Sequence, residues 1–105
     1  MRNEELLIRL TQTQGIAGYE KKVRELIEQE VRPYADELIV DPLGSLIAVK
    51  KGKGGPHPKK IMFAAHMDEI GFMVKKIEED GRLLVCNVGW NWTASAYNTR
   101  VVFRN

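Results

Sequence analysis

An apolar run that stops at a histidine and two carboxylates is the feature that most limits how this chain can fold. Residues 61–65 (IMFAA) are followed at once by His66, Asp68 and Glu69. A short continuous apolar run is typical of a fully buried strand. If Lys60–Ala65 is that central strand, His66 and Asp68 leave its C-terminal end together, where open α/β sheets bind their ligands.

The pairing of His66 with Asp68 indicates a metal site, because a carboxylate that supports an imidazole is common at protein metal centres. A catalytic zinc usually takes three protein ligands and keeps one open position. The other histidine, His57, lies between two prolines in a Lys- and Gly-rich stretch. The chain therefore contains one end of a metal site without a convincing set of further ligands. The alternative is a purely structural histidine–carboxylate hydrogen bond. Glu69 could line the site, or it could be a solvated surface residue or cap a loop.

Composition narrows the class of protein. A length of 105 residues corresponds to one small domain or to a piece of a larger one. The 16 basic and 14 acidic residues give a net charge of +2, which implies no strongly charged partner. The single cysteine excludes an internal disulfide framework and fits a reducing cytosol, so we expect a cytoplasmic protein. Since no apolar run approaches the ~20 residues that span a bilayer, we expect no membrane partner.

A lysine cluster offers a nucleic-acid interpretation that the surrounding residues do not favour. Five lysines fall within residues 50–60. The stretch has no aromatic residue to stack on bases and no predicted helix to enter a groove. We therefore expect a solvated loop and no nucleic-acid partner.

Periodicity predicts two helices followed by short strands. Apolar residues recur at helical spacing over residues 3–14 and 19–31. Beyond these helices the period changes to that of strands, expected over residues 38–40, 46–49, 60–65, 72–77, 83–88 and 99–103. The acidic-Gly turn after residue 77 predicts that its two flanking strands form a hairpin. This order of elements indicates an α+β or α/β unit.

Four short motifs within the first 90 residues carry a resemblance to a known family. The most specific is residues 65–74 (AHMDEIGFMV), and three others occur in a supporting order: 15–20 (GIAGYE), 41–46 (DPLGSL) and 88–90 (VGW). Together they resemble the N-terminal portion of the tetrahedral (TET) dinuclear-metal aminopeptidases. That family includes glutamyl and deblocking aminopeptidases, and some of its members have been named endoglucanase or cellulase M.

The resemblance implies an α/β fold, namely the N-terminal part of a dinuclear-zinc exopeptidase-like catalytic domain, with two helices and then mixed β-strands. Residues 1–70 would belong to that catalytic domain, and residues 71–105 would be the incomplete start of an inserted β-domain. His66 is implied to bind one of two divalent metal ions, zinc or cobalt. Asp68 is implied to be the catalytic residue behind the imidazole, where it fixes the tautomer. The implied activity is that of a metalloaminopeptidase acting on a peptide substrate as a homo-oligomer.

The chain also departs from the family pattern. Only Gly89 precedes Trp90, where the family usually has two glycines. Family members are much longer, and their remaining metal ligands and general-base glutamate lie in the portion absent here, so we expect the isolated chain to be inactive alone. The alternative is a truncated, non-catalytic interaction or assembly module. Glycan hydrolysis follows only from the names of some members, and glycosidases usually rely on two flanking carboxylates without metals.

Overall fold

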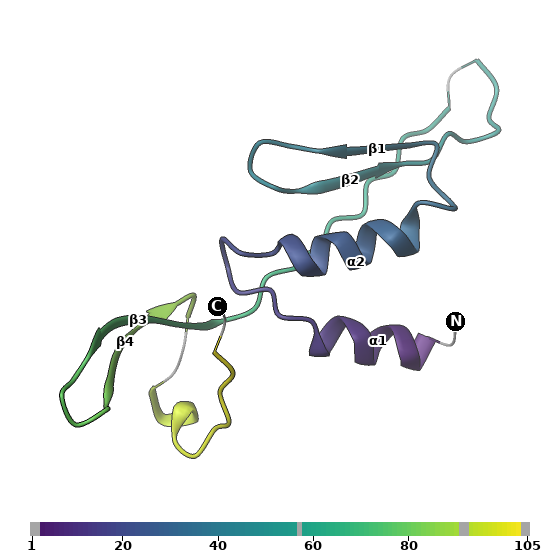
Figure 1. Ribbon diagram of the computed structural model, residues 1–105. Helices are drawn as coiled ribbons and strands as arrows, with labels where there is room; N and C mark the ends of the chain where they lie inside the picture. Colours follow the sequence, from purple (N-terminus) through teal and green to yellow (C-terminus); the bar gives the residue numbers. More distant parts are fainter. Residues whose placement is uncertain (1–2, 57, 91–92, 104–105) are drawn as a thin grey trace. The chain divides into compact units, whose positions relative to one another are not determined.

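The structure, a computed structural model, describes residues 3–56, 58–90 and 93–103. Its elements follow the order helix, helix, strand, strand, strand, strand and a short 3-10 helix (Figure 1). The chain divides into two compact units, Met1–Asp68 and Glu69–Asn105. The first unit holds both helices and the first two strands, and the second holds the last two strands and the 3-10 helix.

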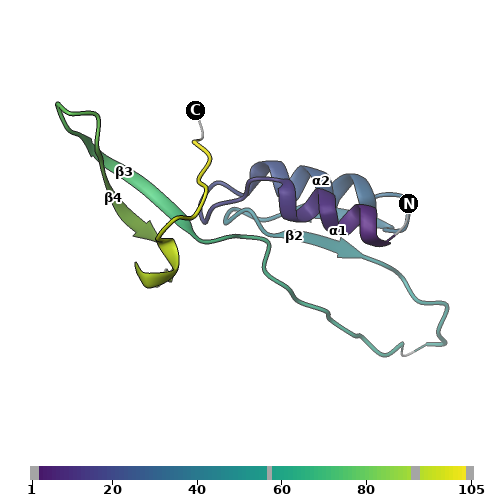
Figure 2. The same cartoon turned by 90° about the horizontal axis from the view of Figure 1, so that it is seen from below.

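Both predicted helices are present in the first unit. Helix α1 spans Asn3–Gln12 and helix α2 spans Lys21–Val31, each slightly shorter than predicted. Figures 1 and 2 show the two helices side by side. Acidic residues Glu4 and Glu5 occupy the first turn of α1, where they interact favourably with the positive end of the helix dipole.

Helix α2 supplies the most buried side chains of the described residues. Val23 is 5% exposed and Leu26 is 8% exposed, and both belong to the apolar face that the helical spacing predicts. The two helices are joined by an ion pair in which Arg9 Nη1 lies 2.7 Å from Glu30 Oε1. Because both partners are partly exposed, this pair is expected to stabilise the unit by no more than about 1 kcal/mol.

The first two strands form an antiparallel hairpin. Strand β1 (Glu37–Val40) pairs with strand β2 (Leu46–Val49) along its whole length. The turn between them is held by Asp41, whose Oδ1 accepts hydrogen bonds from the backbone N–H groups of Leu43 (2.9 Å) and Ser45 (2.8 Å). This arrangement is the local hydrogen bonding by which aspartate favours turns.

Helix α2 contacts this turn directly. Arg24 Nη1 donates a hydrogen bond of 3.1 Å to the carbonyl oxygen of Gly44. Gly44 has a φ of +93°, a conformation that residues with a β-carbon rarely adopt. The turn therefore needs glycine at this position, and the guanidinium of α2 fixes the turn against the helix.

The second unit contains the predicted hairpin. Strand β3 (Gly71–Ile77) pairs antiparallel with strand β4 (Leu83–Val88), and a register shift between Val74 and Lys76 marks a bulge. A 3-10 helix, η1, follows at Thr93–Ala96. The hairpin agrees with the acidic-Gly turn in the sequence, because Gly81 there has a φ of +84°.

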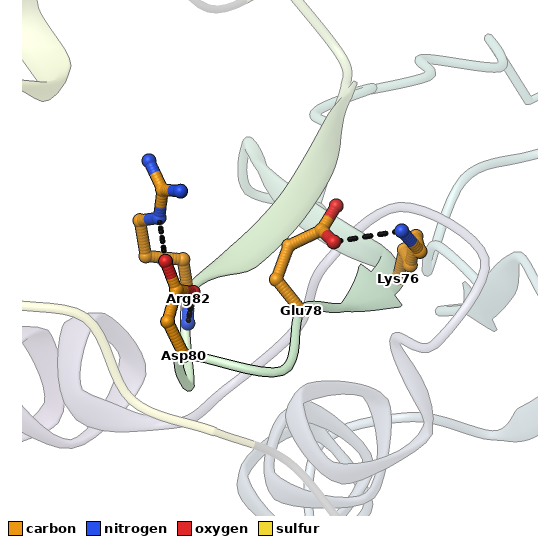
Figure 3. A network of polar contacts seen from close by, with 4 residues as sticks. All are labelled: Lys76, Glu78, Asp80 and Arg82. Atoms are coloured by element: carbon orange, nitrogen blue, oxygen red, sulfur yellow. Dashed lines mark hydrogen bonds and ion pairs between the residues drawn. The ribbon is translucent and has the colours of Figure 1, made fainter.

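Two exposed ion pairs lie at the tip of the β3–β4 hairpin, as Figure 3 shows. Lys76 Nζ lies 2.7 Å from Glu78 Oε2, and Arg82 Nε lies 2.7 Å from Asp80 Oδ2. Asp80 also accepts a hydrogen bond from the backbone N–H of Arg82. These contacts join residues two apart in the chain, so they organise the turn locally.

Two predicted strands are wrong. Residues 58–68 and 99–103 have no regular secondary structure. A strand needs a neighbour for its backbone hydrogen bonds, and the sheets in the described part of the chain contain only β1 with β2 and β3 with β4. The side chains of Ile61, Met62 and Phe63 are accordingly 79%, 87% and 94% exposed instead of buried.

The fold class is α/β, with two helices and short antiparallel strands. Pairing is antiparallel in both described sheets, so the parallel component implied by mixed β-strands is not seen in these residues. The assignment of residues 1–70 to a catalytic domain and of residues 71–105 to an inserted β-domain stays a prediction. Within the ranges that the structure covers, no helix is both long enough and apolar enough to cross a membrane.

Candidate metal half-site

His66 and Asp68 lie together, as predicted, although they do not follow a strand. They end an extended segment, residues 58–68, that leads to the boundary of the first unit (Figure 1). The backbone of this segment approaches the α1–α2 loop at Met67, whose carbonyl oxygen is close to Gly15. The local chain places the two side chains together, and Gly15 lies beside the backbone that joins them.

The imidazole of His66 has two acceptors at the same ring nitrogen. Nδ1 lies 3.0 Å from Asp68 Oδ1 and 3.1 Å from the backbone carbonyl oxygen of Asp68. A carbonyl oxygen and an ionised carboxylate can only accept hydrogen bonds, so Nδ1 carries the proton that is donated. In the neutral imidazole the other nitrogen, Nε2, is then unprotonated. This is the tautomer in which Nε2 can bind a metal ion.

Exposure leaves the imidazole accessible. The His66 side chain is 83% exposed and that of Asp68 is 42% exposed. A hydrogen bond with a purely structural role would not require Nε2 of His66 to remain accessible. The pair can therefore present one nitrogen ligand to a divalent ion, with a carboxylate that restrains the ring.

The donor types fit a divalent transition metal, but they amount to one end of a site. Imidazole nitrogen suits zinc and neighbouring first-row ions. Among residues 3–56, 58–90 and 93–103, no group of three His, Cys, Asp or Glu side chains is placed to hold a metal. His57 lies outside the described residues, and Glu69 is exposed in the second unit. The metal role of His66 and the supporting role of Asp68 stay predictions.

The structure adds one residue that sequence reasoning missed. Gly15 is buried, and a β-carbon placed on it would lie only 2.8 Å from Cγ1 of Val23, and 3.5 Å from the carbonyl oxygen of Met67. From the sequence, Gly15 was noted only as the first residue of a supporting motif, residues 15–20. Its occurrence in the GIAGYE motif was the available signal, but a glycine that is required for close packing cannot be distinguished from a helix stop without coordinates.

Comparison with known proteins relates the chain to aminopeptidases. Residues 44–105 match the family model described as M42 glutamyl aminopeptidase. A putative aminopeptidase of Acetivibrio thermocellus is 48% identical over 101 residues, which cover 96% of this chain and 29% of that protein. Lysyl aminopeptidase of Pyrococcus furiosus is 41% identical over 86 residues, which cover 81% of this chain and 24% of that protein.

Solved structures show the same relationship. A TET aminopeptidase from a marine sediment archaeon, Thaumarchaeota archaeon, matches with a TM-score of 0.75 and 37% identity, over 85% of this chain and 24% of that one. A protein named endoglucanase from Thermotoga maritima matches with a TM-score of 0.70 and 42% identity, over 79% of this chain and 26% of that one. The chain thus spans less than a third of the length of each of these similar proteins.

Proposed function

Because this chain belongs to the M42 glutamyl aminopeptidase family, we propose that it is part of a metal-dependent aminopeptidase that removes N-terminal residues from peptides. His66 would bind one of two divalent metal ions, zinc or cobalt, through Nε2. Asp68 would support the imidazole. The observation that carries this proposal is the 3.0 Å contact between His66 Nδ1 and Asp68 Oδ1, which supports a proton on Nδ1, the nitrogen that would not face the metal.

Each side chain has a separate task in this proposal. Asp68 holds the proton on Nδ1 and restrains the rotation of the ring, and its backbone carbonyl assists at 3.1 Å. His66 then offers an unprotonated nitrogen in a defined direction. When divalent metal ions are bound at such a site, they supply Lewis acidity that polarises the scissile carbonyl of a peptide. The other metal ligands would come from parts of the protein beyond this chain.

The cellular setting and assembly belong to the same proposal. The single cysteine fits a reducing compartment, which supports a cytoplasmic enzyme. Homo-oligomeric assembly is supported by apolar side chains that the β3–β4 hairpin exposes, among them Met73 (50%), Ile77 (70%) and Leu84 (51%). Exposed apolar groups of this kind are common at protein interfaces.

The test is a histidine exchange in the complete protein. His66→Ala removes the proposed ligand, while His57→Ala removes the other histidine of the chain and serves as the matched control. We expect His66→Ala to lower the affinity for zinc by at least about 10-fold and to reduce peptide cleavage in parallel. Metal content is measured by elemental analysis after dialysis, and release of N-terminal residues is measured on short peptides.

The outcomes separate the proposal from its rival. If His66→Ala retained the metal content and peptidase activity of the parent protein, His66 would not be a ligand. If the parent protein itself neither bound zinc nor cleaved peptides, the non-catalytic interaction module would be the better account. The unfolding temperature of the metal-free variants shows whether a loss of binding reflects a loss of fold.

A further inference from the structure

Gly15 fills a narrow space between helix α2 and the segment that carries the candidate metal ligand. It is buried in the loop between α1 and α2. A β-carbon added at Gly15 would lie 2.8 Å from Cγ1 of Val23 and 3.5 Å from the carbonyl oxygen of Met67. Met67 is the residue between His66 and Asp68. A β-carbon here would therefore overlap the Val23 side chain of α2 and would lie at ordinary contact distance from the backbone of the half-site.

Space, and not backbone conformation, is what excludes a side chain at this position. The positive-φ glycines of the described chain are Gly18, Gly44, Gly81 and Gly89, and Gly15 is not among them. A left-handed φ is thus not the reason for glycine at position 15. The obstacle is the 2.8 Å approach to Val23, which is shorter than carbon atoms tolerate.

We propose that Gly15 is a positioning residue for the metal half-site. A side chain at this position would strike Val23 and displace the loop that carries residue 15, and the Met67 backbone beside that loop lies between His66 and Asp68. The inference rests on the proposed metal role of His66. Val23 is β-branched, lies within a helix and is 5% exposed, so rotation of its side chain has little room. A larger residue at position 15 therefore displaces the loop and the backbone that it contacts.

A small displacement is sufficient to affect metal binding. Metal–ligand distances in proteins are held within about 0.2 Å of their preferred values. Residues that orient a ligand without touching the metal typically change the metal affinity by about 10–100-fold when they are substituted. Gly15 acts one step further away, through Met67, so we expect an effect near the lower end of that range.

The experiment compares two glycine-to-alanine exchanges in the complete protein. Gly15→Ala introduces the clash, whereas Gly55→Ala introduces a β-carbon with no atom within 4 Å and no positive φ. Both exchanges reduce the freedom of the unfolded chain equally. We expect Gly15→Ala to weaken zinc affinity about 10-fold, measured by competition with a chromophoric chelator, and Gly55→Ala to leave it unchanged. The unfolding temperature of the metal-free protein is recorded alongside.

A second exchange tests the steric cause. Val23→Ala removes the Cγ1 atom that Gly15→Ala would strike, so the double variant should bind zinc as tightly as Val23→Ala alone. If the double variant stays about 10-fold weaker than Val23→Ala, the steric explanation is wrong. If Gly15→Ala alone does not fold, the comparison of the double variant with Val23→Ala still tests the steric explanation.

Failure of this inference is distinguishable from failure of the proposed function. Wild-type zinc affinity in a folded Gly15→Ala variant overturns the positioning role. If His66→Ala loses zinc in the same assay, the metal role of His66 stands and only the role of Gly15 falls. If His66→Ala binds zinc as tightly as the parent protein, the proposed metal role of His66 is wrong, and the inference about Gly15 falls with it.

Discussion

Replacing Asp68 with asparagine tests how the half-site is built. Asp68→Asn removes the negative charge beside the imidazole while nearly preserving the shape of the side chain. Oδ1 lies 3.0 Å from His66 Nδ1, and the backbone carbonyl oxygen of the same residue lies 3.1 Å from that nitrogen. The backbone acceptor remains in the variant, so Nδ1 keeps a partner for its proton and the tautomer is preserved.

The expected loss is therefore modest. Partners that orient a metal-binding histidine are typically worth about 10–100-fold in metal affinity. The backbone carbonyl remains and the Asp68 side chain is 42% exposed, so its charge is partly screened by water. We expect Asp68→Asn to weaken zinc binding about 10-fold, which corresponds to about 1.4 kcal/mol.

The assay is a zinc competition titration on the metal-free complete protein. Asp80→Asn is the matched control, because it removes the same charge from a carboxylate that pairs with Arg82. It should leave zinc affinity unchanged. If Asp68→Asn bound zinc as tightly as the parent protein, or lost no more affinity than Asp80→Asn, the carboxylate would not support a metal ligand.

Two further predictions concern the turn between β1 and β2. Gly44→Ala and Gly18→Ala both place a β-carbon at a positive φ, at about 1–2 kcal/mol each, but only Gly44→Ala meets Arg24 Nη1, at 2.9 Å. Arg24 Nη1 is the end of a flexible side chain and can move aside, so the extra loss in urea unfolding should be that of its hydrogen bond to Gly44, about 1 kcal/mol. Equal losses for the two variants would show that this hydrogen bond does not stabilise the turn. The backbone N–H of Ser45 is the main cause that lowers the pKa of Asp41 below its ordinary value of 3.8. This stabilisation is present above pH 3.8 and is lost as the pH falls through the lower folded pKa, so unfolding curves of Asp41→Asn should depend less on pH in that range.

The helices and hairpins were predictable because their causes are local. Apolar spacing within one segment predicts both helices, and Val23 and Leu26 are indeed the buried residues of α2. The two hairpins follow from short-range turn chemistry, in which Asp41 accepts hydrogen bonds from nearby N–H groups and Gly81 adopts a positive φ. Such patterns need no knowledge of distant parts of the chain.

The predicted strands at 60–65 and 99–103 failed for the opposite reason. Apolar composition shows that a segment can enter a sheet, but a strand forms only with a partner for its hydrogen bonds. In the residues described, Phe63 is 94% exposed, and β1 and β3 pair with β2 and β4 alone. Pairing depends on segments distant in sequence, and periodicity within the run itself contains no information about them.

The candidate site likewise has a local part and a part that depends on distant segments. The two-residue spacing of His66 and Asp68 already indicates that they can meet, because side chains two residues apart lie on the same side of an extended backbone, and the observed contact is 3.0 Å. That the pair lies beside Gly15 and Val23 could be learned only from the folded chain, because this proximity brings together residues from three separate segments. Interactions between neighbouring residues can be inferred from the sequence, whereas close packing depends on how distant segments of the chain come together.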